Sequence, residues 1–201
     1  MTMPMAATSA AVTPAAAWSA RVRRVGGLIQ LAFATFWLVR GALSIGGETG
    51  IVLAGGALVL VAAVLAYAVR VTAGTGQKPT GPAARRIERS LTLATLLQLA
   101  ASFTLPVVVT ATGHRDWLLP SIAITIGPLL MWLDHLVQIP RYRPVGWALT
   151  VGPLILGVAM SGTSLATTTG LAAGVLLLGT ATAGFHDLSG QPSRRPPTAP
   201  G

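Results

Sequence analysis

Six long apolar segments alternate with short polar segments along this chain of 201 residues. A helix needs roughly 20 mostly apolar residues to cross the hydrocarbon core of a bilayer, which is about 30 Å thick. A helix also satisfies its own backbone hydrogen bonds in that environment. The pattern therefore predicts six transmembrane helices, over residues 25–45, 51–70, 90–112, 117–138, 145–162 and 167–186.

The composition agrees with this pattern and sets the class of protein. Hydrophobic residues make up 52% of the chain, charged residues make up 9%, and the mean hydropathy is +0.68. So little polar surface cannot cover a soluble domain of this length. We expect an all-α integral membrane protein whose partner is the lipid bilayer, with a six-transmembrane-helix bundle over residues 21–188. Disordered tails are predicted at 1–20, rich in Ala, Thr and Pro, and at 189–201, rich in Pro.

Positive charge predicts the orientation of the bundle. Twelve of the 14 Lys and Arg residues fall at alternate ends of the apolar segments: Arg21, Arg23, Arg24, Arg70, Lys78, Arg85, Arg86, Arg89, Arg141, Arg143, Arg194 and Arg195. Basic residues in short loops stay in the cytoplasm, so both termini are expected there. This arrangement accounts for the net charge of +9 without a nucleic-acid partner.

The use of 13 Arg and one Lys, with abundant Ala and Gly, is typical of bacteria with GC-rich genomes. The expected location is therefore the bacterial cytoplasmic membrane, with the chain passing through it several times. A signal peptide cut near Ala42 is an alternative for the first segment, although its apolar run is long for that purpose. The absence of Cys excludes disulfides, thiolate metal sites and cysteine nucleophiles.

The predicted helix 90–112 carries a row of polar residues along one side. At 100° per residue, the row falls within an arc of about 120°. Its members are Glu88, Thr92, Thr95, Gln98, Ser102 and Thr110, with Pro106 on the same side. Such groups are unfavourable in hydrocarbon unless something pairs with them. Two interpretations are open: the wall of a hydrated cavity or solute path, and hydrogen bonding between helices.

The predicted helix 117–138 repeats the pattern less fully. Ser121, Thr125, Trp132 and His135 share an arc of about 80° with Pro128, which is expected to kink the helix. Broken helices line the substrate sites of many transporters. The two helices together therefore favour a path for a small solute or ion between them.

Two pairs of titratable residues are expected at the cytoplasmic boundary. Asp134 and His135 end one predicted helix, and His186 and Asp187 end another. If these pairs meet, Asp134, His135 and His186 are weak candidates for a metal site or a proton relay. The other interpretation is a solvated helix end at which His interacts with the helix dipole. No cofactor or catalytic motif is present.

Arg40 lies inside the first predicted helix, about 7 Å from its outer end. Its side chain can reach the lipid headgroups. Alternatively it pairs with Glu48 or Asp116, or holds an anionic substrate. Near the other end of the chain, Gly170 and Gly174 form a GxxxG motif, which serves helix packing within the chain or dimerisation.

The stretch from Ile126 to His135, continued by Pro140-Arg141-Tyr142-Arg143 and Gly146, resembles small multi-pass bacterial membrane proteins of uncharacterised families. The resemblance implies the same general fold and carries no activity, ligand or catalytic residue.

Our functional hypothesis is binding or translocation of a small solute or ion between helices 90–112 and 117–138. The polar path would contain Thr95, Gln98, Ser102 and Thr125, with Arg40 and His135 toward its opposite mouths. A second hypothesis is an accessory subunit that packs against a membrane partner or another copy of itself. A third is a membrane-embedded enzyme acting at the cytoplasmic boundary through Asp134, His135 and His186.

Overall fold

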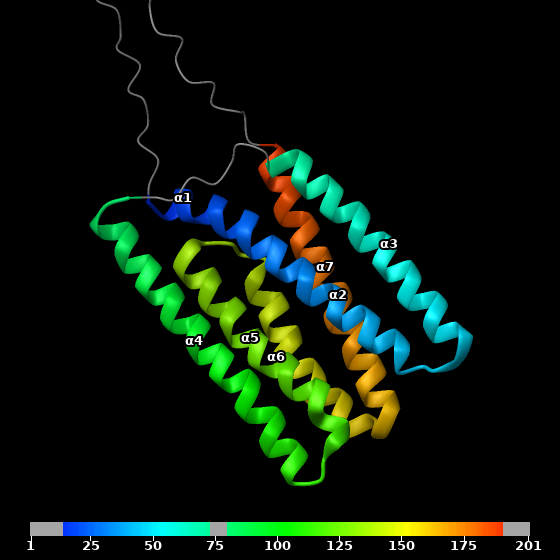
Figure 1. Ribbon diagram of the computed structural model, residues 1–201. Coiled ribbons are helices and arrows are strands. Elements are labelled where there is room, and N and C mark those ends of the chain that lie inside the picture. The colour runs from blue at the N-terminus through cyan, green and yellow to red at the C-terminus, as the bar shows by residue number, and fades with distance from the viewer. Residues whose placement is uncertain (1–13, 73–79, 191–201) are drawn as a thin grey trace, which may run out of the picture.

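The computed structural model describes residues 14–72 and 80–190, and the elements in these ranges are all helical (Figure 1). In chain order they are α1 (Pro14–Arg21), the π-helical turn η1 (Val22–Gly26), α2 (Gly27–Leu43), α3 (Gly47–Thr72), α4 (Pro82–Ala111), the 3-10 turn η2 (Arg115–Trp117), α5 (Leu118–Val137), α6 (Tyr142–Ala159) and α7 (Gly162–Ser189). Each of the six predicted segments overlaps one helix from α2 to α7. α5 continues through Pro128 without a break.

Five of the described helical stretches are long and apolar enough to cross a membrane. They are Trp18–Leu43, Gly47–Thr72, Pro82–Ala111, Arg115–Val137 and Gly162–Ser189. α6 is shorter, with 18 residues, or about 27 Å of helix. The described chain is thus an all-helical protein in which several helices have the length and composition of membrane spans.

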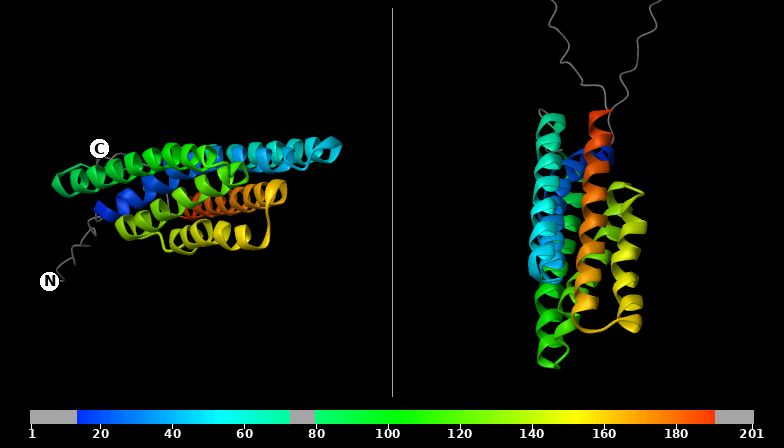
Figure 2. Two further views of the ribbon diagram at one scale, coloured as in Figure 1. Left: turned by 90° about the horizontal axis from the view of Figure 1, so that it is seen from below. Right: turned by 90° about the vertical axis from the view of Figure 1, so that its right-hand side faces the viewer.

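The helices pack side by side, with α2 against α7 and α5 against α6 as the two most extensive contacts. α3 and α4 lie at opposite edges of the bundle (Figures 1 and 2). α3 packs on α2 and α7, whereas α4 packs chiefly on α5. Within α4, Ala84 is the one fully buried residue. The edge helices therefore present long apolar faces to their surroundings.

Glycines allow a close helix contact between α2 and α7. A Cβ added at Gly170 would lie 2.9 Å from the Cα of Gly41, and one added at Gly174 would lie 2.6 Å from the Cγ of Leu38. The GxxxG motif, for which the sequence left two roles open, thus packs against α2 of the same chain. A second pair, Gly127 and Gly146, brings α5 and α6 equally close.

The predicted disordered tail over residues 1–20 requires a correction, because the chain is helical from Pro14. Proline suits the first position of a helix, and the three alanines after it have the highest helix propensity. Trp18 then anchors the segment, since only 5% of the residue is exposed. Residues 1–13 and 191–201 lie outside the described ranges, and Ser189, predicted to begin the second tail, is the last residue of α7.

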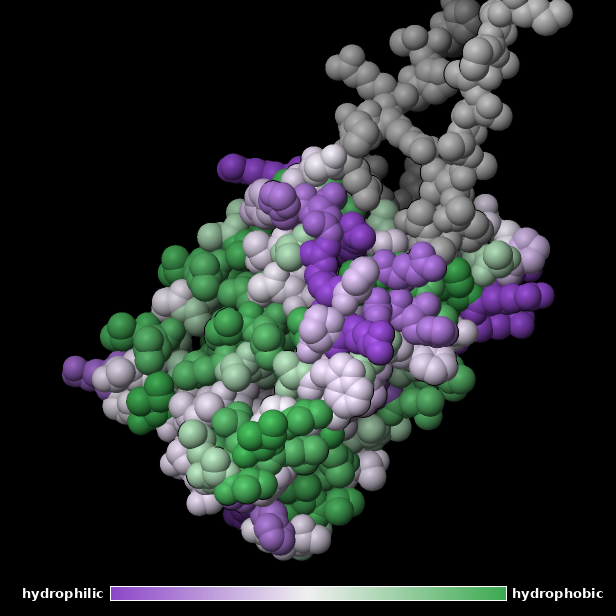
Figure 3. Space-filling view, turned by 180° about the vertical axis from the view of Figure 1, so that it is seen from behind, coloured by the Kyte–Doolittle hydropathy of each residue, from purple (hydrophilic) through white to green (hydrophobic). Residues whose placement is uncertain are grey.

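Basic helix ends gather at one end of the bundle. α1 ends with Arg21, α3 carries Arg70 in its last turn, and α6 begins beside Arg141, all at the end where α7 finishes (Figure 1). Seen from behind, hydrophilic surface covers this end and hydrophobic surface covers the flanks below it (Figure 3). Lys78, Arg194 and Arg195 fall outside the described residues.

Candidate binding cavities between α2, α4 and α5

Three residues of the predicted polar path meet where α4 crosses α5. The Nε2 of Gln98 donates to the Oγ of Ser102 at 2.9 Å, and this Oγ lies 2.7 Å from the Oγ1 of Thr125. The Oγ1 of Thr125 donates in turn to the carbonyl oxygen of Ile122 at 2.7 Å. We call this chain of hydrogen bonds the α4–α5 seam. It is the arrangement that the interhelical interpretation of the polar row requires.

The donor in the Ser102–Thr125 hydrogen bond can be identified by counting hydroxyl protons. A hydroxyl has one proton, and that of Thr125 is used on the Ile122 carbonyl. Ser102 must therefore donate to Thr125, while it accepts from the amide of Gln98. The bond from Ser102 to Thr125 is the one that joins α4 to α5, and the other two lie within α4 and within α5. Replacing Gln98 removes one of these bonds, whereas replacing Ser102 or Thr125 removes two.

Two cavities border the seam. The first, of about 430 Å³, lies between η1 and α2 on one side and α4 and α5 on the other, with Trp18, Arg21, Tyr142 and Leu177 completing its wall. The second, of about 450 Å³, lies between α4 and α5. Gln98 and Leu129 belong to the walls of both. The walls are mostly aliphatic and aromatic, and the volumes fall within the range of small-molecule sites.

The first cavity has polar groups that the seam does not use. Gln30, at 7% exposure, belongs to its wall, and the Oε1 of Gln30 is buried without a hydrogen-bond partner in the described part of the chain. The same holds for the Nε1 of Trp18. Such atoms are unfavourable in a dry site. Both residues belong to the wall of the first cavity, so this mostly apolar wall includes an amide and an indole group.

The π-helical turn η1 forms part of the wall of the first cavity. Val22, Val25 and Gly26 of this turn belong to the cavity wall. A π-helical turn widens the helix locally and is common at functional sites. The turn also places Arg23 on the side facing α7, where its Nη1 lies 3.1 Å from the Oδ2 of Asp187.

Tyr142 is the first residue of α6 and belongs to the wall of the first cavity. Burial raises the pKa of its hydroxyl above 10.0, although the Gln30 side chain and the charges of Arg141 and Arg23 partly offset the shift.

Because the pKa of Tyr142 is raised, the folded state keeps the hydroxyl proton at a pH where the unfolded chain has lost it. Stability should therefore fall as the pH rises above about 10. Thermal unfolding in detergent between pH 8 and 11 checks this, because Tyr142→Phe should weaken the fall and Tyr67→Phe should leave it unchanged. An identical fall in all three proteins would contradict it.

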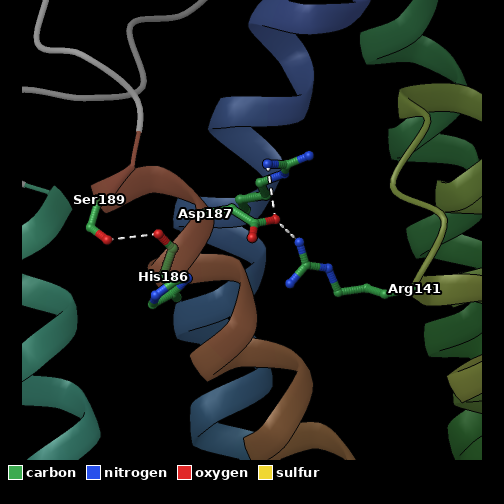
Figure 4. Close-up of polar contacts among 5 residues, drawn as sticks. Arg141, His186, Asp187 and Ser189 are labelled. Atoms are coloured by element: carbon green, nitrogen blue, oxygen red, sulfur yellow. Dashed lines mark hydrogen bonds and ion pairs between the residues drawn. The ribbon is translucent and has the colours of Figure 1, made fainter.

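Asp187 joins three elements at the basic end of the bundle. It pairs with Arg23 of η1 and with Arg141, which precedes α6 (Figure 4). All three side chains are partly exposed, at 18%, 26% and 34% for Arg23, Arg141 and Asp187. Partial burial and the neighbouring charge of Arg23 lower the pKa of Arg141. This ion cluster links η1 and the start of α6 to the end of α7.

The candidate metal residues do not form a ligand set. His135 and His186 are exposed, Asp134 is half-buried, and Asp187 is occupied by the two arginines. Figure 4 shows the carbonyl of His186 accepting from Ser189 on the side of α7 away from Arg141. Within residues 14–72 and 80–190, three or more His, Asp or Glu residues never come together as a metal site would require.

The other predicted path residues are placed differently from the seam. Thr95 belongs to the wall of the first cavity and donates to the Leu91 carbonyl at 2.8 Å. Arg40 is exposed, and it forms no ion pair with Glu48 or Asp116. Asp116 instead accepts from the backbone N–H of Gly162 at 3.2 Å. Arg40 and His135 belong to the wall of neither the first nor the second cavity.

Trp18, Gln30 and Tyr142 are site residues that the sequence analysis did not single out. A signal existed for Gln30, which is an amide in the middle of an apolar segment, as Gln98 is. Trp18 and Tyr142 gave none, because they lie outside the predicted helices. Comparison with models of protein families, with curated proteins and with solved structures finds no match to this chain.

Proposed function

We propose that this chain is a six-span protein of a bacterial cytoplasmic membrane, with both termini in the cytoplasm, and that it binds and translocates a small lipophilic solute. Support for the location comes from the apolar helices and from the basic residues at one end of the bundle. α6 would be the remaining span, since its 18 residues extend about 27 Å and it packs against α5.

The observation that carries the functional proposal is the position of Gln98. Its side chain belongs to the walls of two cavities, and its amide is the first donor of the seam between them. A solute moving from one cavity to the other passes this residue. Mostly apolar walls favour a lipophilic solute over a hydrated ion, because they offer an ion few groups to replace its water.

Replacing Gln98 with leucine and Thr125 with valine should abolish solute binding while leaving the fold intact. Both substitutions keep the side-chain volume and remove the polar atoms. An interhelical hydrogen bond in a membrane contributes only about 0.6 kcal/mol on average, so the bundle should remain folded. Native mass spectrometry of the protein in mild detergent measures the bound mass, which we expect in the wild type and not in the double variant.

Thr92→Val supplies the matched control. Thr92 belongs to the same polar row on α4, but it is exposed and donates to the carbonyl of Glu88 at 2.9 Å. The control should keep the bound mass. Equal adducts in the wild type and in the Gln98→Leu, Thr125→Val double variant would disprove the proposed site.

A second function is favoured by the exposure of α4. Phe103 and Val107 on this helix are 69% and 68% exposed, and a single α4 residue is fully buried. A helix held mainly by one neighbour suits an accessory subunit that packs against a membrane partner. The same mass measurement separates the two functions, because a stoichiometric second polypeptide, without a small-molecule adduct, would favour the accessory subunit.

A further inference from the structure

The first cavity is elongated and differs between its two ends. Its wall on the α1–α2 side runs from Arg21 to Phe33, which corresponds to about 18 Å along a helix. The end near Arg21 also holds Trp18 and Tyr142, which are amphipathic. Toward Phe33 the wall is mostly aliphatic and aromatic, with Leu99 of α4 among its residues, and Gln98 is the neighbouring polar residue of α4. A site of this shape matches a molecule with a polar head and an apolar chain.

The charge at the polar end is positive. Arg21 is the one charged residue among the described residues of the cavity wall. Its guanidinium carbon lies 5.9 Å from the centre of the Trp18 ring, so the charge lies beside that ring at this end of the wall. The neighbouring ion cluster combines two arginines with one aspartate, so it adds a net positive charge. This field favours an anionic head group.

We propose, on the basis of the proposed solute site, that the ligand of the first cavity is an anionic amphiphile. Its carboxylate or phosphate lies at Arg21, and one acyl chain extends toward Phe33. A volume of about 430 Å³ suits one chain rather than two. An anionic phospholipid that inserts one of its chains and a free fatty acid share this chemistry. Basic sites between helices at the cytoplasmic side are a known setting for anionic lipids.

Trp18 provides a direct test, because bromine atoms on an acyl chain quench indole fluorescence on contact. Only 5% of Trp18 is exposed, so a brominated chain reaches it by entering the cavity. The full-length protein is placed in phosphatidylcholine vesicles that contain either brominated phosphatidylglycerol or brominated phosphatidylcholine at equal mole fraction. The Trp18 signal is the fluorescence difference between the wild type and Trp18→Phe. A third arm adds brominated fatty acid to unbrominated vesicles and so distinguishes the two sources.

We expect the brominated anionic lipid or the fatty acid to quench Trp18 with an apparent affinity about fivefold greater than that of the brominated neutral lipid, which is the effect of one basic residue. Arg21→Gln should remove the difference. Arg143→Gln, at an exposed arginine of the same end, should keep it. Trp132 of the second cavity is 49% exposed and should be quenched by both lipids alike.

The outcomes separate this proposal from the one on which it rests. Equal quenching of Trp18 by anionic and neutral lipids would overturn the anionic head group but keep the solute cavity. No quenching of Trp18 by any chain, with Trp132 quenched, would overturn both. The comparison of lipids in the wild type decides between these results even if Arg21→Gln fails to fold.

Discussion

Replacing Gly127 with alanine is expected to lower the free energy of unfolding by about 1–3 kcal/mol. A Cβ at this position would lie 2.0 Å from the Oγ1 of Thr150 and 2.4 Å from the carbonyl oxygen of Gly146. The backbone of α6 cannot yield as a flexible side chain does, so α5 and α6 must separate. This separation also moves Leu129 and Leu130, which belong to the wall of the first cavity. Unfolding by sodium dodecyl sulfate in mixed micelles, followed by circular dichroism, measures the change.

Gly152→Ala is the matched control, because Gly152 lies in α6 and an added Cβ meets nothing within 4 Å. Alanine favours a helix over glycine by up to about 1 kcal/mol, so this variant should be as stable as the wild type or slightly more stable. Equal stability of the Gly127→Ala and Gly152→Ala proteins would show that α5 and α6 are not in close contact at Gly127.

The α4–α5 seam could be predicted because its signal is local. Gln98, Ser102 and Thr125 are polar residues at the depth of the membrane, and two of them recur at helical spacing. A short connection makes the two helices antiparallel neighbours, which brings residues near the middle of one helix to the middle of the other. Burial then forces the polar groups to pair with each other. The helical spacing, the short connection between the two helices and the polar residues themselves could all be seen in the sequence.

The placement of Arg40 could not be predicted from its own helix. The neighbouring Gly41 faces α7, where an added Cβ would lie 2.8 Å from the backbone nitrogen of Leu171. Successive residues of a helix differ by about 100°, so Arg40 points away from that contact. The sequence shows that glycine permits close packing, but it does not identify the helix that packs there. The orientation of Arg40 depends on which helix packs against Gly41.

The first cavity could not be predicted from the sequence either, because it also depends on which helices pack together. Its wall takes residues from α1, η1, α2, α4, α5, α6 and α7, and α1 falls mostly in a segment predicted to be disordered. Gln30 is a single polar residue without a periodic companion on its helix. Tyr142 falls between two predicted helices, and it reaches the cavity because α6 begins earlier than the apolar pattern does. Each residue became relevant through contacts between elements that are distant in the chain.

Asp187 illustrates how charge pairing depends on the same contacts. Its neighbour His186 suggested a site with Asp134 and His135, since all four residues were expected at one boundary. In the structure, η1 runs along the end of α7 and brings Arg23 to the carboxylate, while the turn before α6 brings Arg141. Two guanidinium groups compete more effectively for a carboxylate than a neutral imidazole does.

Replacing Asp187 with asparagine is expected to lower the free energy of unfolding by about 1–3 kcal/mol. The amide keeps the size of the side chain but leaves Arg23 and Arg141 close together without a counter-charge. Because Asp187 is 34% exposed, solvent screening keeps the loss below that of a fully buried pair. Added salt should narrow the difference from the wild type, since it weakens both the native ion pairs and the repulsion in the variant. Thermal unfolding in a zwitterionic detergent at low and high salt measures both effects.

The double variant Arg23→Gln, Asp187→Asn identifies the cause of that loss. If repulsion between the arginines contributes, removing one of them should restore part of the stability, and the double variant should be more stable than additivity of the single changes implies. Asp134→Asn is the control at the same end of the bundle, because Asp134 forms no ion pair among the described residues and should tolerate the change. An Asp187→Asn protein with wild-type stability at low salt would show that the ion cluster does not hold η1 and α6 together.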